Sequence, residues 1–211
     1  MKIEMPPSTM LNPVPVVMVS CAGKEPEKID KKPNIITCAW AGTVNSEPPM
    51  VSVSIRKSRH SHDLICETQE FVINLVTEDL AKACDYCGVR SGANEDKFEK
   101  MELHAVPAPK LSYAPMIEEA PLSISCKLKD ILELGSHDMF LAEVVGVSID
   151  ERLLNSKGKI CLEKAHLVTY CHGDYYSIGR MLGFFGYSVA SKEALKRRMP
   201  PKKTKKSNKN K

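Results

Sequence analysis

The residues best equipped for chemistry form a short basic segment at 56–61. They are Arg56, Lys57, Ser58, Arg59, His60 and Ser61. The segment follows a strand-like run and leads into a helical pattern over 62–69, which Ser61 is expected to cap. Free backbone N–H groups and the positive dipole end of a helix suit a phosphate, and guanidinium groups add charge-assisted hydrogen bonds. Taken alone, the pattern also fits an ordinary basic turn.

A second segment surrounds the only tryptophan of the chain. Its residues are Thr37, Cys38, Ala39, Trp40, Ala41, Gly42 and Thr43. Small residues at the end of a strand let a flat ligand approach the backbone closely. The alternative is a tryptophan packed in the core.

Two further groups each have a chemical and a structural interpretation. His137 stands at a strand start between Ser136 and Asp138, where a histidine is either a turn residue or part of a nearby substrate site. Cys84 and Cys87 are spaced as a redox pair or as half of a zinc site. No second pair has matching spacing, and both fall on the apolar face of a predicted helix. Core packing is therefore favoured, and no metal site is predicted.

Motifs for side-chain chemistry are missing from the sequence. It contains no Walker loop, nucleophile elbow, HExxH or GxGxxG followed by a helix, and no paired-carboxylate arrangement is evident. This indicates chemistry carried by a cofactor.

Short strands outnumber helices in the predicted elements. In residues 50–55, apolar Val51, Val53 and Ile55 alternate with serines, the period of two that a strand with one buried face shows. Further strands are predicted at 14–20, 34–40, 71–76, 122–129, 139–149 and 166–171. Besides the helix over 62–69, short helices are expected after Thr77 and after Asn94. About six antiparallel strands with short helices predict a mainly β, α+β fold built on a small barrel.

Composition limits the size of the core, the presence of membrane spans and the cell compartment. The 211 residues are 43% hydrophobic, which is enough for one sizeable core. We expect no membrane span, because no apolar stretch approaches about 18–20 residues, and we read no signal peptide. These features predict a cytoplasmic protein, in which the eight cysteines are mostly reduced thiols packed as small hydrophobes.

The positive net charge belongs to the end of the chain. Residues 192–211 carry ten Lys/Arg and one acid, whereas the preceding 191 carry 20 basic and 25 acidic residues. We therefore expect a folded domain over 1–191 and a basic, disordered, solvated tail over 192–211. Contact of this tail with nucleic acid or with a membrane is the less favoured alternative.

Read together, the segments resemble the flavin-reductase-like FMN-binding split barrel, and within it the flavoredoxin branch. The resemblance covers roughly residues 14–188. It rests on the order and spacing of "NIITCAWAGTV" at 34–44, "PPMVSVSIRKSRHSHDLI" at 48–65, "EFVINLV" at 70–76, "CGVRSGANEDKFEK" at 87–100, "GSHDMFLAEVVGV" at 135–147 and "YYSIGRMLGFFGYSV" at 175–189.

The resemblance implies a six-stranded antiparallel Greek-key split barrel that binds FMN at the interface of a homodimer. It places the isoalloxazine ring against Thr37, Cys38, Ala39, Trp40 and Ala41. It places the ribityl chain and phosphate against Ser54, Ile55, Arg56, Ser58, Arg59, His60 and Ser61. Asn34, Lys97 and Tyr170 are further cofactor positions. At the position of Ser61 the family also has threonine. At the position of Tyr170 the family pattern predicts a phenylalanine.

Lys97 and His137 are the implied catalytic residues. A cation such as Lys97 would stabilise the anion that reduced flavin forms at N1, and His137 matches a histidine near the nicotinamide or flavin face. The leading hypothesis is an NAD(P)H-dependent flavin reductase. The alternatives are an FMN electron carrier reduced by a redox protein partner, and a flavin-binding or thiol-bearing sensor without turnover.

Overall fold

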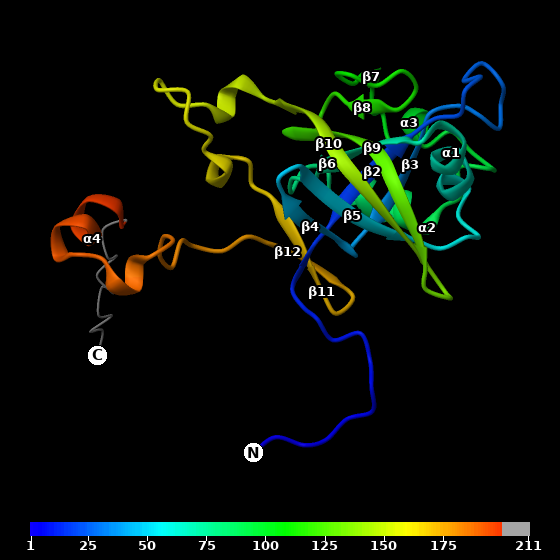
Figure 1. Cartoon of the computed structure of the whole chain (residues 1–211). Helices are drawn as coiled ribbons and strands as arrows, with labels where there is room; N and C mark the ends of the chain where they lie inside the picture. The colour runs from blue at the N-terminus through cyan, green and yellow to red at the C-terminus, as the bar shows by residue number, and fades with distance from the viewer. Residues whose placement is uncertain (200–211) are drawn as a thin grey trace, which may run out of the picture. The chain divides into compact units, whose positions relative to one another are not determined.

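The centre of the fold is a seven-stranded antiparallel sheet that curls into a half-barrel (Figure 1). The computed structural model describes residues 1–199. In spatial order the strands are β3 (Asn34–Cys38), β2 (Val17–Cys21), β6 (Glu70–Leu75), β9 (Leu122–Glu133), β10 (Asp138–Ile149), β5 (Pro49–Ile55) and β4 (Ala41–Ser46).

The prediction of a mainly β fold with short helices is confirmed, but the count of six strands is wrong. The additional strand is β4, which forms a hairpin with β5 through pairs such as Gly42 with Ser52. Its sequence Ala-Gly-Thr-Val-Asn-Ser has no apolar alternation, and nearly all of it is exposed. Pairing with β5, and not burial of a face, holds this strand in place, so the period-of-two pattern could not reveal it.

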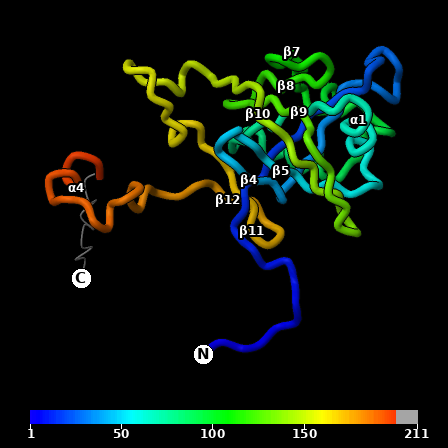
Figure 2. Tube along the Cα trace, viewed as in Figure 1, coloured from blue at the N-terminus to red at the C-terminus, as the bar shows by residue number. Residues whose placement is uncertain are grey.

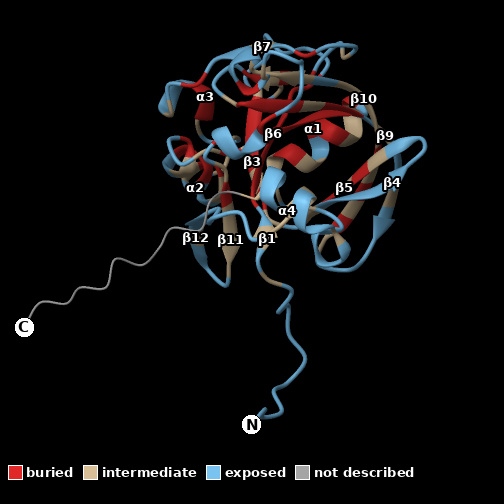
Figure 3. Cartoon of the chain, turned by 90° about the vertical axis from the view of Figure 1, so that its left-hand side faces the viewer, coloured by how far each residue is buried: buried red, intermediate tan, exposed pale blue. Residues whose placement is uncertain are grey.

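Alternation in the predicted strands places one face of the sheet in the core (Figure 3). Inward side chains of β5, β6 and β10, among them Val53, Phe71 and Phe140, pack with Leu64 and Ile65 of α1 (His60–Thr68). A second cluster packs the other side of β2 and β3 against α2 (Ala81–Val89) and α3 (Lys97–Lys100). The two clusters fix the helices against the β3 side of the sheet.

The helices begin at different residues from those predicted. Arg59, in extended conformation, is the N-cap of α1, and Ser61 lies inside the helix. Thr77 Oγ1 accepts a hydrogen bond from Leu80 N at 3.3 Å, but α2 starts only at Ala81. The cap of α3 is Asp96, whose side chain accepts from Glu99 N, and not Asn94. In each case the predicted polar residue lies within a few residues of the observed helix start.

Two smaller sheets flank the half-barrel. One contains β1 (Val14–Pro15), β11 (Val168–Cys171) and β12 (Asp174–Ser177), and the other contains β7 (Ala105–Pro107) and β8 (Pro115–Ile117). The β11–β12 turn, visible in the trace of Figure 2, holds His172 and Gly173 at φ of 50° and 104°. Positive φ at both turn residues gives the twist that a two-residue hairpin requires.

The chain divides into two units, Met1–Ile178 and Gly179–Lys211. Within the second, Ser191 caps α4 (Lys192–Arg198) by accepting from Ala194 N at 3.2 Å. Within the predicted basic tail, Lys192–Arg198 form this helix, and residues 200–211 lie outside the described part. Among residues 1–199, no helix is long and apolar enough to cross a membrane.

Candidate functional site

The segment around Trp40 lies at a corner of the half-barrel. Strands β3 and β4 are the two opposite edges of the sheet, yet only Ala39 and Trp40 separate them in the chain. Ser54 N on β5 donates to Trp40 O at 2.9 Å, and Thr37 Oγ1 donates to the carbonyl of Cys84 on α2. These bonds hold the backbone of the corner between the sheet and α2.

A cavity of about 540 Å³ opens at this corner. Ten residues predicted for the cofactor or for catalysis line it: Thr37, Cys38, Ala39, Trp40, Ser54, Ile55, Arg56, Arg59, His137 and Tyr170. Its volume is within the range of small-molecule sites, about 300–1,000 Å³. The cavity thus gathers segments that are far apart in the sequence.

Trp40 and His137 form one rim of this cavity. Their ring centroids are 4.6 Å apart, and the rings are tilted by 50°. Ser136 Oγ lies 2.9 Å from His137 Nδ1. Burial, with a smaller contribution from the charge of Arg56, lowers the pKa of His137, so its ring is neutral at pH 7. A neutral, oriented imidazole can position a ligand without adding charge to the cavity.

A smaller polar hollow lies beside the cavity and shares Ile36 and Arg59 with it. The hollow also contains Asn34, His60, Ser61, Cys87, Arg90, Ser91, Gly92 and Lys97. It is located at the N-terminus of α1, where backbone N–H groups have no partner within the helix. Two arginines, a lysine and a histidine around one helix start make the hollow suited to an anion.

Lys97 lies in this hollow and not among the residues that line the larger cavity. Its side chain is 2% exposed, and Nζ donates to Ile35 O at 2.7 Å and to Cys87 O at 2.9 Å. Both acceptors are neutral carbonyls. Burial lowers the pKa of Lys97. A buried ammonium without a counter-charge is costly, and an anion bound in the hollow would supply that charge.

Asn34, in the same hollow, has one polar atom without a partner among the described residues. Its Nδ2 donates to Ser61 Oγ at 2.8 Å, while Oδ1 is buried without any hydrogen bond. Gly92 is packed against this amide, because a Cβ on Gly92 would lie 2.1 Å from Oδ1. An unsatisfied buried acceptor beside a basic cluster fits a ligand that presents hydroxyl groups next to an anionic group.

Two predicted cofactor residues line neither space. Ser58 is exposed, and Ala41 begins β4 just beyond the corner. Conversely, the cavity uses residues that sequence patterns did not single out: Thr9, Leu11, Asn12, Val14, Val16, Asp85, Gly88, Val89, His172, Gly173 and Tyr175. Only the His172-Gly173 pair carried a usable signal, that of a hairpin turn.

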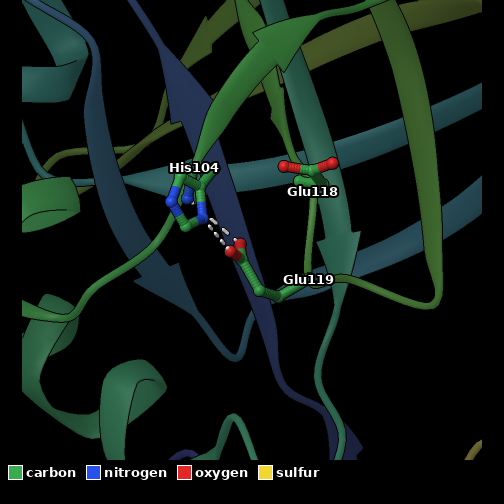
Figure 4. Close-up of side chains that lie close together, drawn as sticks. All are labelled: His104, Glu118 and Glu119. Carbon is green, nitrogen blue, oxygen red and sulfur yellow. Dashed lines mark hydrogen bonds and ion pairs between the residues drawn. The ribbon is translucent and has the colours of Figure 1, made fainter.

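Two other groups have the residue types of a thiol site and of a metal site. Cys84 and Cys87 are buried in the cluster between β2, β3 and α2, and burial raises their pKa values to about 12 and about 11. This agrees with core packing. His104, Glu118 and Glu119 lie together on the β7–β8 hairpin (Figure 4), but all are exposed and Nδ1 of His104 already contacts Glu119 Oε1 at 2.5 Å.

Comparison with known proteins identifies the family. The sequence model of the flavin reductase like domain matches residues 9–179. The chain belongs to this family. It is 31% identical to flavoredoxin of Desulfovibrio vulgaris (Miyazaki F), with a TM-score of 0.81 over 90% of this chain and 100% of that chain.

Two enzymes of known activity match shorter stretches of the family domain. The reductase component of a 4-nitrophenol 4-monooxygenase/4-nitrocatechol 2-monooxygenase from Rhodococcus opacus is 34% identical over 46% of this chain and 49% of its own. An NADH:riboflavin 5'-phosphate oxidoreductase from Streptomyces pristinaespiralis is 25% identical over 50% of this chain and 56% of its own. Flavin reductases and flavoredoxins are therefore both among the relatives of this chain.

Proposed function

We propose that this protein binds FMN and acts as an NAD(P)H-dependent flavin reductase. The supporting observation is the pairing of two spaces that share Arg59: a cavity lined by backbone and aromatic groups, and a basic hollow with a buried, unpaired lysine. FMN has a flat ring at one end and a phosphate at the other. The chemistry of the residues in the two spaces suits these two ends.

In this proposal the phosphate occupies the hollow, where Arg59, Ser61 and Lys97 hold it together with the N-terminus of α1. The unsatisfied Oδ1 of Asn34 accepts from a ribityl hydroxyl. The ring lies against residues 37–40, where small side chains expose the backbone. A cation in the hollow also stabilises the anionic, reduced cofactor over its neutral form, although less strongly with distance.

Bound flavin would supply the hydride-accepting chemistry, so the chain needs no nucleophile of its own. His137 and Trp40 at the rim would orient the nicotinamide ring of the donor. The Streptomyces relative is named as an NADH:riboflavin 5'-phosphate oxidoreductase, which supports a nicotinamide donor and FMN as the acceptor.

The 31% identity to a flavoredoxin favours a second candidate, an FMN electron carrier reduced by a protein partner. Both candidates need the same FMN site and differ only in the electron donor. Rapid bleaching of the flavin by NADH or NADPH under anaerobic conditions supports the reductase. Bleaching only by a reduced redox protein supports the carrier.

We also propose that the protein is a homodimer. On β5 and β10, Ser54 pairs with Met139 and Ser52 with Leu141, and these side chains point away from the core that holds Val53 and Phe140. Apolar side chains on an outward face are typical of an interface between subunits. Light scattering after gel filtration measures the subunit number directly.

The central test is a flavin titration of the purified full chain. We expect a yellow complex with about one FMN per chain, and much weaker binding of riboflavin, which has no phosphate for the hollow. A protein that binds neither flavin contradicts the proposal. Equal affinity for both flavins contradicts the placement of the phosphate.

A further inference from the structure

A second constellation, outside the flavin site, joins Cys66, His62 and Asp138. His62 and Cys66 are one helical turn apart on α1, and Asp138 begins β10. Cys66 Sγ lies 3.8 Å from His62 Nδ1, and Asp138 Oδ2 lies 2.9 Å from His62 Nε2. None of the three lines the cavity or the hollow. They stand in the order of a nucleophile, a base and an orienting carboxylate.

The histidine is held firmly in this arrangement. The Asp138 side chain is 4% exposed and that of His62 is 12% exposed. The His62 ring also packs edge-on against Phe140, with centroids 5.2 Å apart. When Nε2–H donates to Asp138, Nδ1 carries a lone pair that can accept the thiol proton of Cys66.

Charged groups lie around His62 on its own helix and on neighbouring elements. Asp138 contacts one ring nitrogen, and Asp63 Oδ1 lies 3.2 Å from the other. Lys57 Nζ lies 3.7 Å from Asp138 Oδ1, but it is also paired with Glu133. One carboxylate therefore lies at each nitrogen of the ring.

The thiol itself stays protonated at neutral pH. Burial first, and then the charges of Asp63 and Asp138, raise the pKa of Cys66. Attack by Cys66 therefore requires that a base remove its proton as the new bond forms, and His62 is the group in reach.

Access to reagents separates Cys66 from most other cysteines. Six of the eight are buried, and only Cys66 and Cys171 are partly exposed. Cys171, on β11, has no hydrogen bond to a histidine ring in the described residues. The chain thus offers its own comparison, a thiol beside an oriented base and a thiol without one.

We propose that Cys66 is a base-assisted nucleophile that exchanges with small disulfides. His62 Nδ1 takes the thiol proton as Sγ attacks one sulfur of the disulfide R–S–S–R. A new S–S bond joins Cys66 to one R–S group, the original S–S bond breaks, and the leaving thiolate receives the proton from His62. The products are a mixed disulfide on Cys66 and one R–SH, with no net gain or loss of electrons. The step requires no flavin.

The test uses the reduced, full-length protein without flavin, and dithiobis(nitrobenzoic acid) as the disulfide. The coloured thiolate released gives the rate, and mass spectrometry of peptides locates the modified cysteine. We expect a fast phase at Cys66 that is retained in Cys171→Ala and lost in Cys66→Ala. His62→Gln should slow this phase by about a hundred-fold, within the range of general-base effects.

A pH profile separates base assistance from a structural role. In His62→Gln the rate should follow the thiolate fraction and rise about ten-fold per pH unit through neutrality, whereas the native rate should vary much less. Asp138→Asn should reduce the rate while leaving Cys66 modifiable, and circular dichroism checks that it folds. The same rate and the same pH slope in native protein and His62→Gln overturn the proposal, as does modification of Cys171 ahead of Cys66.

Discussion

The cavity and the hollow present different chemical groups. The cavity is formed by backbone, small residues and rings at a corner where two sheet edges meet, and its histidine is neutral. The hollow is formed by cations and amides around the start of α1. Backbone recognition leaves little trace in side-chain identity, whereas a basic cluster is visible in the sequence. Substitutions should affect the two spaces separately, except at Ile36 and Arg59, which line both.

The largest effect is expected from Arg59→Ala. Loss of charge-assisted hydrogen bonds costs about 1.5–3 kcal/mol, so FMN affinity should fall roughly ten- to hundred-fold. Riboflavin affinity should change much less. Arg56→Ala is the matched control, because Arg56 lines the cavity alone. Fluorescence titration measures all four affinities, and equal losses for both flavins would disprove the division between the two spaces.

Lys97→Met should lower the affinity for FMN by about ten-fold. It should also change how the free energy of unfolding depends on pH. Because the pKa of Lys97 is lower in the folded than in the unfolded chain, protonation of Lys97 opposes folding. The free energy of unfolding of the flavin-free native protein should therefore increase as pH rises from the folded pKa toward the ordinary lysine value of 10.5. Urea unfolding at several pH values should show this contribution in native protein and its absence in Lys97→Met.

Gly92→Ala should disturb the hollow without changing any charge. The added Cβ would lie 2.1 Å from Asn34 Oδ1 and must displace the amide from Ser61. We expect FMN affinity to fall several-fold. Gly42→Ala is the control, since a Cβ there meets nothing within 4 Å. An unchanged affinity in Gly92→Ala would show that Asn34 does not contact the ligand.

His137→Gln should act on the cavity alone. FMN affinity should stay close to that of the native protein, and anaerobic reduction by NADH should slow by about ten-fold, because the donor loses a positioning contact. Ser136→Ala removes only the 2.9 Å contact to His137 Nδ1 and should have a smaller effect. Stopped-flow absorbance measures the rate, and an unaltered rate in His137→Gln removes this residue from the site.

The smallest effect is expected from replacing Cys84 and Cys87 together by alanine. Both are packed in the core, so stability should fall by about 1–3 kcal/mol while turnover per bound FMN is retained. Steady-state rates normalised to flavin content measure this. Lost turnover with FMN still bound would instead make the pair a redox relay.

The sequence predicted the long strands with a clear apolar alternation and missed short or mostly exposed ones. Strands β5 and β9 were identified, whereas β4 and β12, which are mostly exposed, were not. The segments at 37–41 and 56–61 could be identified as candidate ligand-binding segments from their residue types. The position of Lys97 in the hollow could not, because a lysine near the start of a polar helix is usually solvated, and only tertiary packing buries it.

Strand β4 forms one edge of the seven-stranded sheet, and an edge strand can pair with strands of other molecules. The register of β4 with β5 shifts between Thr43 and Asn45, which is a β-bulge. A bulge breaks the regular spacing of N–H and C=O groups and increases local twist, so β4 is a poor template for edge-to-edge aggregation. The strand next to the cavity is thereby protected from uncontrolled polymerisation.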